Sequence, residues 1–126
     1  MQNRLKKNIS SRISSINPFY SNNSFALTYH SINDSNHELT SQLYQLSVNN
    51  FKEQINYLNE NDFISANVSN IFNKKKHYII TFDDGYEELY QICHELLNVQ
   101  NINCLIFLCP IFVTSKKKGY LSISQI

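Results

Sequence analysis

The sequence lacks an excess of charge of either sign. Its 126 residues carry 11 lysines and arginines against 10 aspartates and glutamates, which gives a formal net charge of +1. A nucleic-acid-binding domain usually concentrates positive charge, and a partner of cationic proteins concentrates negative charge. This composition therefore gives no indication of either class. The two short lysine runs, 74–76 and 116–118, lie between apolar segments, and we interpret both as solvated loops.

Long apolar runs are also absent. No stretch of 18 apolar residues occurs, so the sequence predicts no transmembrane helix. Residues 1–20 are basic but have no continuous apolar core, and we therefore do not interpret them as a secretory signal. The expected location is the cytoplasm, or a secreted or periplasmic one if the N-terminus is incomplete.

The sequence also lacks paired cysteine motifs. Cys93, Cys104 and Cys109 are odd in number and none of them forms a C-x-x-C pair. This spacing argues against a zinc cluster and against a disulfide framework. Because all three lie in apolar surroundings, we expect buried free thiols.

What the sequence does contain is enough apolar residues for one core. Hydrophobic residues make up 42% of the chain, and its length fits a single domain. Residues 1–24 are polar, with isoleucines at helical spacing, so a short amphipathic helix and a frayed extension are both consistent with them. We expect the folded domain to comprise residues 25–126.

Within this domain, strand patterns alternate with helical patterns. Segments rich in apolar residues predict strands at 25–32, 78–82 and 104–109. Apolar positions with the 3.6-residue period predict helices from Ser47 to about residue 58 and from about 87 to 99. Shorter expected pieces are a loop at 33–45, a strand at 63–64, a helical turn at 68–72 and the start of a helix at 122–126. This alternation predicts an α/β fold with parallel strands, as a sheet or a barrel.

The most informative segment is YIITFDDGYEELY, residues 78–90. Asp83 and Asp84 follow a predicted strand, and Gly85 is one of only two glycines. Active sites of α/β folds lie at the carboxyl ends of strands. Two adjacent carboxylates repel each other, and a divalent cation relieves that repulsion: one carboxylate can bind the metal while the other takes a proton from water. Two structural interpretations compete, namely an Asp-Gly turn and Asp84 as the N-cap of the next helix.

The string TFDDGY resembles the first motif of the polysaccharide deacetylase family, the group with the NodB homology domain (carbohydrate esterase family 4). Segments on both sides also resemble that family. FALTYHSI resembles its first strand, the helix with Phe51, Gln54 and Leu58 resembles the one before the motif, and CLIFLCPIFV and GYLSISQI resemble the segments after it. The resemblance runs from Phe25 to Ile126, about four-fifths of the chain.

The resemblance implies a fold and an activity. The fold would be an incomplete, distorted (β/α) barrel in which parallel strands alternate with helices. The activity would be that of a hydrolase acting on carbon–nitrogen bonds other than peptide bonds, which removes N-acetyl groups, or less often O-acetyl groups, from an acetylated polysaccharide or oligosaccharide. Asp83 would be the general base and Asp84 a ligand of a divalent metal, zinc or a similar ion. His30 would line the substrate groove or hydrogen-bond a catalytic carboxylate.

The histidines depart from the family pattern. The family's metal site needs two histidines three or four residues apart after the Gln-Ile stretch, and none of His30, His37, His77 and His94 has such a neighbour. We expect His37 and His94 to be exposed and His77 to lie at the wrong end of its strand.

We therefore expect residues 25–126 to be a partial domain, truncated at the C-terminus and inactive alone unless a missing half or self-association completes the site. Two alternatives remain. One is a non-catalytic remnant or carbohydrate-binding module with the same fold. The other is an unrelated α/β interaction domain in which Asp84 caps a helix.

Overall fold

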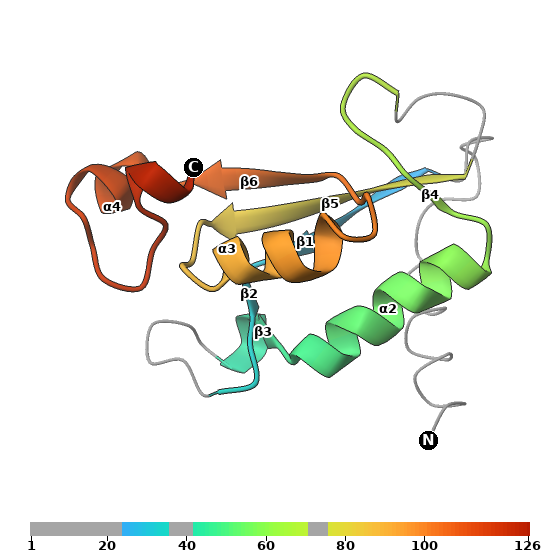
Figure 1. Cartoon of the computed structure of the whole chain (residues 1–126), viewed down its shortest axis with the longest axis horizontal. Helices are drawn as coiled ribbons and strands as arrows, with labels where there is room; N and C mark the ends of the chain where they lie inside the picture. The colour runs from blue at the N-terminus through green and yellow to red at the C-terminus, as the bar shows by residue number, and fades with distance from the viewer. Residues whose placement is uncertain (1–23, 36–41, 71–75) are drawn as a thin grey trace.

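The computed structural model describes residues 24–35, 42–70 and 76–126 (Figure 1). The strands in these ranges are β1 (Phe25–Tyr29), β2 (Ser31–Ile32), β3 (Gln45–Leu46), β4 (Ile64–Ser65), β5 (His77–Asp84) and β6 (Cys104–Leu108). The α-helices are α2 (Val48–Glu60), α3 (Leu89–Ile92) and α4 (Pro110–Thr114). Three further turns of helix are the 3-10 segments η1 (Gln42–Tyr44) and η3 (Ile123–Gln125) and the π-helical η2 (Cys93–Leu97).

The main sheet is built around β5. One edge of β5 pairs with β1, so that Tyr29 lies opposite Phe82. The other edge pairs first with β4, at His77, and then with β6 from Ile80 onward. Each of these strand pairings is parallel, as is that of β2 with β3 in a separate two-stranded sheet. The prediction of an α/β fold with parallel strands is therefore confirmed.

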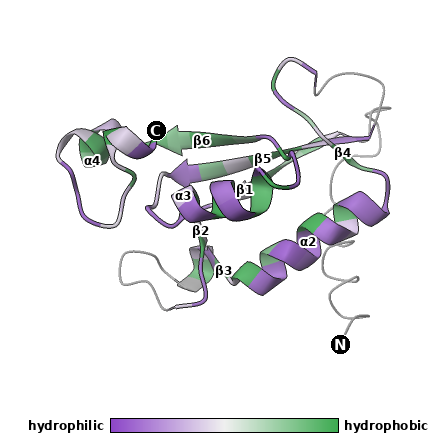
Figure 2. Cartoon of the chain, viewed as in Figure 1, coloured by the Kyte–Doolittle hydropathy of each residue, from purple (hydrophilic) through white to green (hydrophobic). Residues whose placement is uncertain are grey.

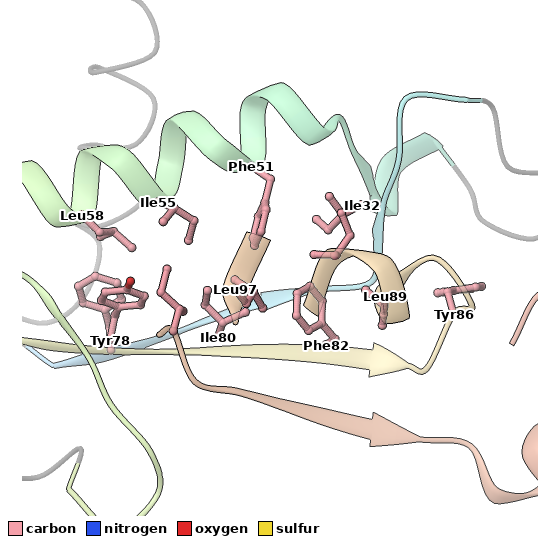
Figure 3. Close-up of a cluster of buried hydrophobic side chains, with 13 residues drawn as sticks. Ile32, Phe51, Ile55, Leu58, Tyr78, Ile80, Phe82, Tyr86, Leu89 and Leu97 are labelled. Atoms are coloured by element: carbon pink, nitrogen blue, oxygen red, sulfur yellow. The ribbon is translucent and has the colours of Figure 1, made fainter. Parts of the chain in front are cut away.

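Helix α2 covers one face of this sheet. Its N-cap is Ser47, as predicted, and the Ser47 side chain accepts a hydrogen bond from the backbone N–H of Asn50 at 3.2 Å. Its buried side chains, Phe51, Ile55 and Leu58, point toward β5 (Figure 3). The i, i+4, i+7 spacing thus places one apolar stripe against the sheet, which is how a helix of low overall hydropathy can pack stably.

The helix expected at 87–99 forms, but it is shorter and it changes type. It begins at Leu89 as α3 and continues as η2, where the backbone N–H of Asn98 donates to the carbonyl of Cys93 at 2.8 Å. This i to i+5 bond is the mark of a π-turn, which is often found near functional sites. Leu89 and Leu97 remain on the buried side (Figure 3), as their periodicity predicts.

Several short elements differ from the prediction. The strand expected at 25–32 bends at His30 and becomes β1 and β2, and β2 pairs with β3 inside the expected loop. Pro110 ends β6 but also starts α4, because proline is well accommodated in the first turn of a helix. The expected extension at 1–24, apart from Ser24, lies outside the described residues. Of the turn expected at 68–72, residues 68–70 form a turn and residues 71–72 lie outside the described residues.

The prediction that the three cysteines are buried is wrong. Cys93, Cys104 and Cys109 are free, but all three are half-buried and not fully buried. No residue of β6, the strand that begins at Cys104, is fully buried, so the apolar composition of this segment overstated the burial of the thiols. No helix within the described ranges is long and apolar enough to cross a membrane.

Candidate functional site

Asp83 and Asp84 form the end of β5, where the strand leaves the core. The preceding six residues of the strand are buried, whereas both aspartates are half-buried. Figure 2 shows this change as a hydrophilic tip on the β5 arrow, beside the hydrophobic β6. The two carboxylates therefore stand at the carboxyl edge of a parallel sheet, the position predicted from the sequence.

His30 lies beside Asp83. Because Tyr29 is paired with Phe82, the next residue of each strand falls at the same edge of the sheet. The distance between His30 Nε2 and Asp83 Oδ2 is 3.8 Å, with 30% and 38% of the two side chains exposed. This distance exceeds that of a direct hydrogen bond but permits an ion pair when the imidazole is protonated. The structure thus brings together two of the three predicted site residues across two strands.

A tight turn follows the aspartates. Asp84 and Gly85 both adopt positive φ, at 69° and 71°, and the Gly85 N–H donates to the Asp83 carbonyl at 2.9 Å. A Cβ atom on Gly85 would lie only 2.6 Å from Leu108 Cδ2. Glycine is therefore favoured here by its backbone conformation, and a side chain at this position would also require the end of the Leu108 side chain to move.

The start of α3 and the shape of the turn before it test the two structural interpretations of these aspartates. The N-cap residue of α3 is Glu88, four residues after Asp84, so the interpretation of Asp84 as a helix cap is wrong. The Asp-Gly turn is present, but it leads from a strand into a helix and so is not a hairpin connection. Neither role explains why two carboxylates stand at this point.

A returning segment holds the turn in place. The Leu121 N–H donates to the Gly85 carbonyl at 2.9 Å, and Tyr86 forms an antiparallel bridge with Tyr120. The Tyr86 and Tyr120 rings stack with centroids 5.1 Å apart. Partial burial, together with Tyr86 and the charge of Asp84, raises the pKa of Tyr120 to about 12. Tyr120 therefore keeps its hydroxyl proton near Asp84 at neutral pH.

Two exposed aromatic rings flank the carboxylates. The Tyr44 ring lies against the His30 ring with centroids 4.8 Å apart, and 56% of Tyr44 is exposed. Phe107 is paired in register with Asp83, so both side chains lie on the same face of the sheet, and 56% of Phe107 is exposed. Sequence reasoning missed Tyr44, Phe107 and Tyr120, because no local pattern reports which distant side chain will meet a strand end.

Comparison with known proteins identifies the fold. No protein-family model and no curated protein matches the sequence. A de-N-acetylase from Aggregatibacter actinomycetemcomitans superposes with a TM-score of 0.68 at 16% identity, over 81% of this chain and 48% of that protein. The chain has the fold of the polysaccharide deacetylases. The resemblance noted in the sequence is thereby confirmed for the fold.

Two further solved structures agree. The Streptococcus pyogenes deacetylase PplD, in complex with acetate, gives a TM-score of 0.67 at 17% identity, over 79% of this chain and 48% of that protein. A polysaccharide deacetylase from Bacillus cereus gives 0.62 at 22% identity, over 81% of this chain and 34% of that protein. This chain thus spans about half the length of the deacetylases it matches, or less.

The side chains at the carboxyl end of β5 include suitable ligand atoms for a divalent metal, but they are too few to form a complete site. Carboxylate oxygens and an imidazole nitrogen are suitable ligands for zinc and related ions. A catalytic zinc usually takes three protein ligands, yet the described residues contain no cluster of three or more histidine, cysteine, aspartate or glutamate side chains placed to hold a metal. Asp83, Asp84 and His30 therefore offer at most part of a ligand set.

The other two described histidines do not add to this set. His77 is buried at the start of β5, the end of the strand away from the aspartates, as predicted. His94 is exposed, as predicted, and its ring lies 4.6 Å from that of Tyr90. His37 lies outside the described residues.

Proposed function

We propose that this chain acts in the metal-dependent deacetylation of a polysaccharide or oligosaccharide. The observation that carries the proposal is the pair Asp83 and Asp84 at the end of the central strand of a deacetylase fold, with His30 Nε2 3.8 Å from Asp83 Oδ2. The parallel sheet would be one part of a distorted (β/α) barrel, and the pair would lie in its mouth.

Asp83 is the proposed general base. It takes a proton from a water molecule whose oxygen attacks the carbonyl carbon of an acetamido group. The carbon–nitrogen bond then breaks, the nitrogen gains a proton, and the products are an amine and acetate. A positioned base of this kind typically contributes about 10²- to 10⁴-fold in rate.

Asp84 is the proposed metal ligand. A bound zinc or similar ion would polarise the acetyl carbonyl and lower the pKa of its water to about 7. The remaining ligands would come from donors other than the described residues of this chain, either elsewhere in the polypeptide or on a partner, which includes a second copy. Asp84 and Asp83 then have different tasks, which explains why two like charges are adjacent.

The exposed rings of Tyr44 and Phe107 are the proposed sugar contacts, together with His30. Just over half of each side chain is exposed, and the Tyr44 ring lies against the His30 ring. Aromatic side chains supply large contact areas at little cost in conformational entropy, which suits a substrate that is a chain of rings.

A second candidate function is a carbohydrate-binding module without catalysis. The incomplete donor set among the described residues favours it, because exposed rings can bind a glycan without a metal. The two candidates share a surface and differ in whether acetate is released.

An acetate-release assay separates them. N-acetylglucosamine oligomers would be incubated with the chain, with and without added zinc, alongside Asp83→Asn, which keeps the shape of the side chain and removes its basicity. Zinc-dependent release that falls at least about 100-fold in Asp83→Asn supports the deacetylase. Binding of the oligomers that is equal in both proteins, without acetate release, would establish the binding module instead.

A further inference from the structure

Two of the three cysteines lie side by side, away from the aspartates. Cys93 is the first residue of η2 and Cys104 the first of β6, and their sulfur atoms are 3.7 Å apart. The contact is a thiol–thiol hydrogen bond. Cys109 lies beyond the other end of β6 and is not part of this pair.

Both thiols are positioned by regular secondary structure, Cys93 by η2 and Cys104 by β6. Cys104 is paired in register with Ile80, whose fully buried side chain belongs to the face covered by helices. The connection from η2 to β6 is closed by a hydrogen bond from the Ile102 N–H to the Leu97 carbonyl at 2.9 Å. The two thiols therefore face each other through well-formed elements and not through a loose loop.

Small molecules can reach the pair. Both cysteines are half-buried and line a groove of about 400 Å³ that is open to solvent. His94 and Asn98 form part of the same groove, so its rim is polar. A peptide-sized thiol or disulfide can thus approach the sulfur atoms without unfolding of the domain.

The hydrogen bond makes the two thiols unequal. It lowers the pKa of the Cys104 thiol, against the effect of partial burial. The same bond, followed by burial, raises the pKa of the Cys93 thiol. Cys104 is therefore the sulfur that ionises first, and the thiolate is the nucleophile in disulfide exchange.

We propose that Cys93 and Cys104 form a site of reversible oxidation by small disulfides such as oxidised glutathione. The Cys104 thiolate attacks one glutathione sulfur, which breaks the glutathione disulfide and releases one reduced glutathione after protonation. Cys93 then loses its proton and attacks the Cys104 sulfur, which releases the second glutathione. Two protein thiols are oxidised and one disulfide is reduced, while the sulfur–sulfur distance shortens from 3.7 Å to about 2.05 Å.

The new bond would tie η2 to β6. It closes a short loop and so removes conformational freedom from the unfolded chain. Strand β6 pairs with β5 from Ile80 to Asp84, so the tether would also hold the strand beside the two aspartates. We expect a higher melting temperature for the oxidised chain. The proposal is independent of the deacetylase function, since it requires neither metal nor glycan.

Thiol counting and peptide mapping on the unmodified chain test the proposal. After treatment with oxidised glutathione and removal of excess reagent, the free thiols should fall from three to one. Proteolysis without reduction should release a peptide pair joined through Cys93 and Cys104, and dithiothreitol should restore all three thiols. Cys109→Ser is the matched control and should fall from two thiols to none.

The Cys93→Ser variant tests the order of attack. It should retain glutathione on Cys104 as a stable mixed disulfide, because no second thiol is present to displace it. The proposal is overturned if the unmodified chain keeps all three thiols, carries glutathione as its final product, or forms disulfides between chains. These readouts come from the native sequence, so poor folding of a variant cannot hide them.

Discussion

Gly85 occupies a position that disfavours other residues through its backbone conformation and through its contact with Leu108. Its φ of 71° is strained for other residues, and an added Cβ would meet Leu108 Cδ2 at 2.6 Å. We expect Gly85→Ala to lower the free energy of unfolding by about 1–3 kcal/mol, measured by urea denaturation. Leu108→Ala should relieve the contact, so the double variant should lose less than the sum of the single losses. Strict additivity would show that the contact contributes nothing.

Asp84 is predicted to matter little for stability. It is not the N-cap of α3, and its φ of 69° is tolerated by asparagine. Asp84→Asn should therefore change the free energy of unfolding by less than about 0.5 kcal/mol. A loss of about 1 kcal/mol or more would show instead that the charge of Asp84 stabilises this turn.

Sequence reasoning at the residue scale predicted where the aspartates lie but not most of the side chains around them. Asp83 and Asp84 could be predicted because a strand pattern ends where they begin, and strand ends carry sites. His30 could be predicted because it follows another strand of a parallel sheet. Tyr44 and Phe107 could not, since their positions depend on a bend and on the register of β6, which no local pattern specifies.

At the scale of elements, the cap of α2 is the clearest test. The Ser47 side chain satisfies the N–H of Asn50, which has no partner within the helix. Ser47→Ala should lower the free energy of unfolding by about 1 kcal/mol, measured by thermal or urea denaturation. Ser47→Asp is the control, because aspartate also accepts this hydrogen bond and should retain most of the stability. Equal losses in both variants would indicate that Ser47 contributes through packing.

Long periodic segments were predictable and short ones were not. The apolar stripe of α2 and the buried run of β5 follow directly from their spacing. By contrast, β2 and β3 have two residues each and no periodicity to read. The start of α3 was placed two residues early, because Glu87 and Glu88 suit a first helical turn but here belong to the turn held by residues 119–121.

At the scale of the whole molecule, the tyrosines make stability depend on alkaline pH. Burial raises the pKa of Tyr29 and of Tyr78, and partial burial raises that of Tyr120 to about 12. A folded-state pKa above the unfolded value of about 10 stabilises the fold below pH 10. This stabilisation is lost as the pH rises above 10 toward the folded-state values. We therefore expect the urea concentration at the midpoint of unfolding to decrease as the pH is raised from 10 to 12.

Tyr78→Phe provides the matched variant. The buried Tyr78 hydroxyl has no hydrogen-bond partner within the described residues, so its removal should leave stability at pH 7 unchanged or increased. The variant should also lose less stability than the unmodified chain on alkaline titration. An identical pH dependence would show that Tyr78 does not ionise differently in the folded and unfolded states.

The fold class was predictable at this scale because strands and helices alternate, and such alternation leads to parallel sheets. The order of strands was not, since nothing in the sequence shows that β4 and β6 share one edge of β5. The metal site of the proposed deacetylase likewise depends on donors that the described residues do not supply.

The proposed function depends on the binding of a metal by Asp84 beside the base Asp83. The most direct test is a zinc titration of the isotopically labelled chain followed by NMR, with Asp84→Asn in parallel. Metal binding by Asp84 should produce chemical-shift changes centred on Asp83 to Gly85 and on His30, and these changes should be lost in the variant. Shift changes confined to Cys93 and Cys104, or changes at the aspartates that persist in Asp84→Asn, would contradict it.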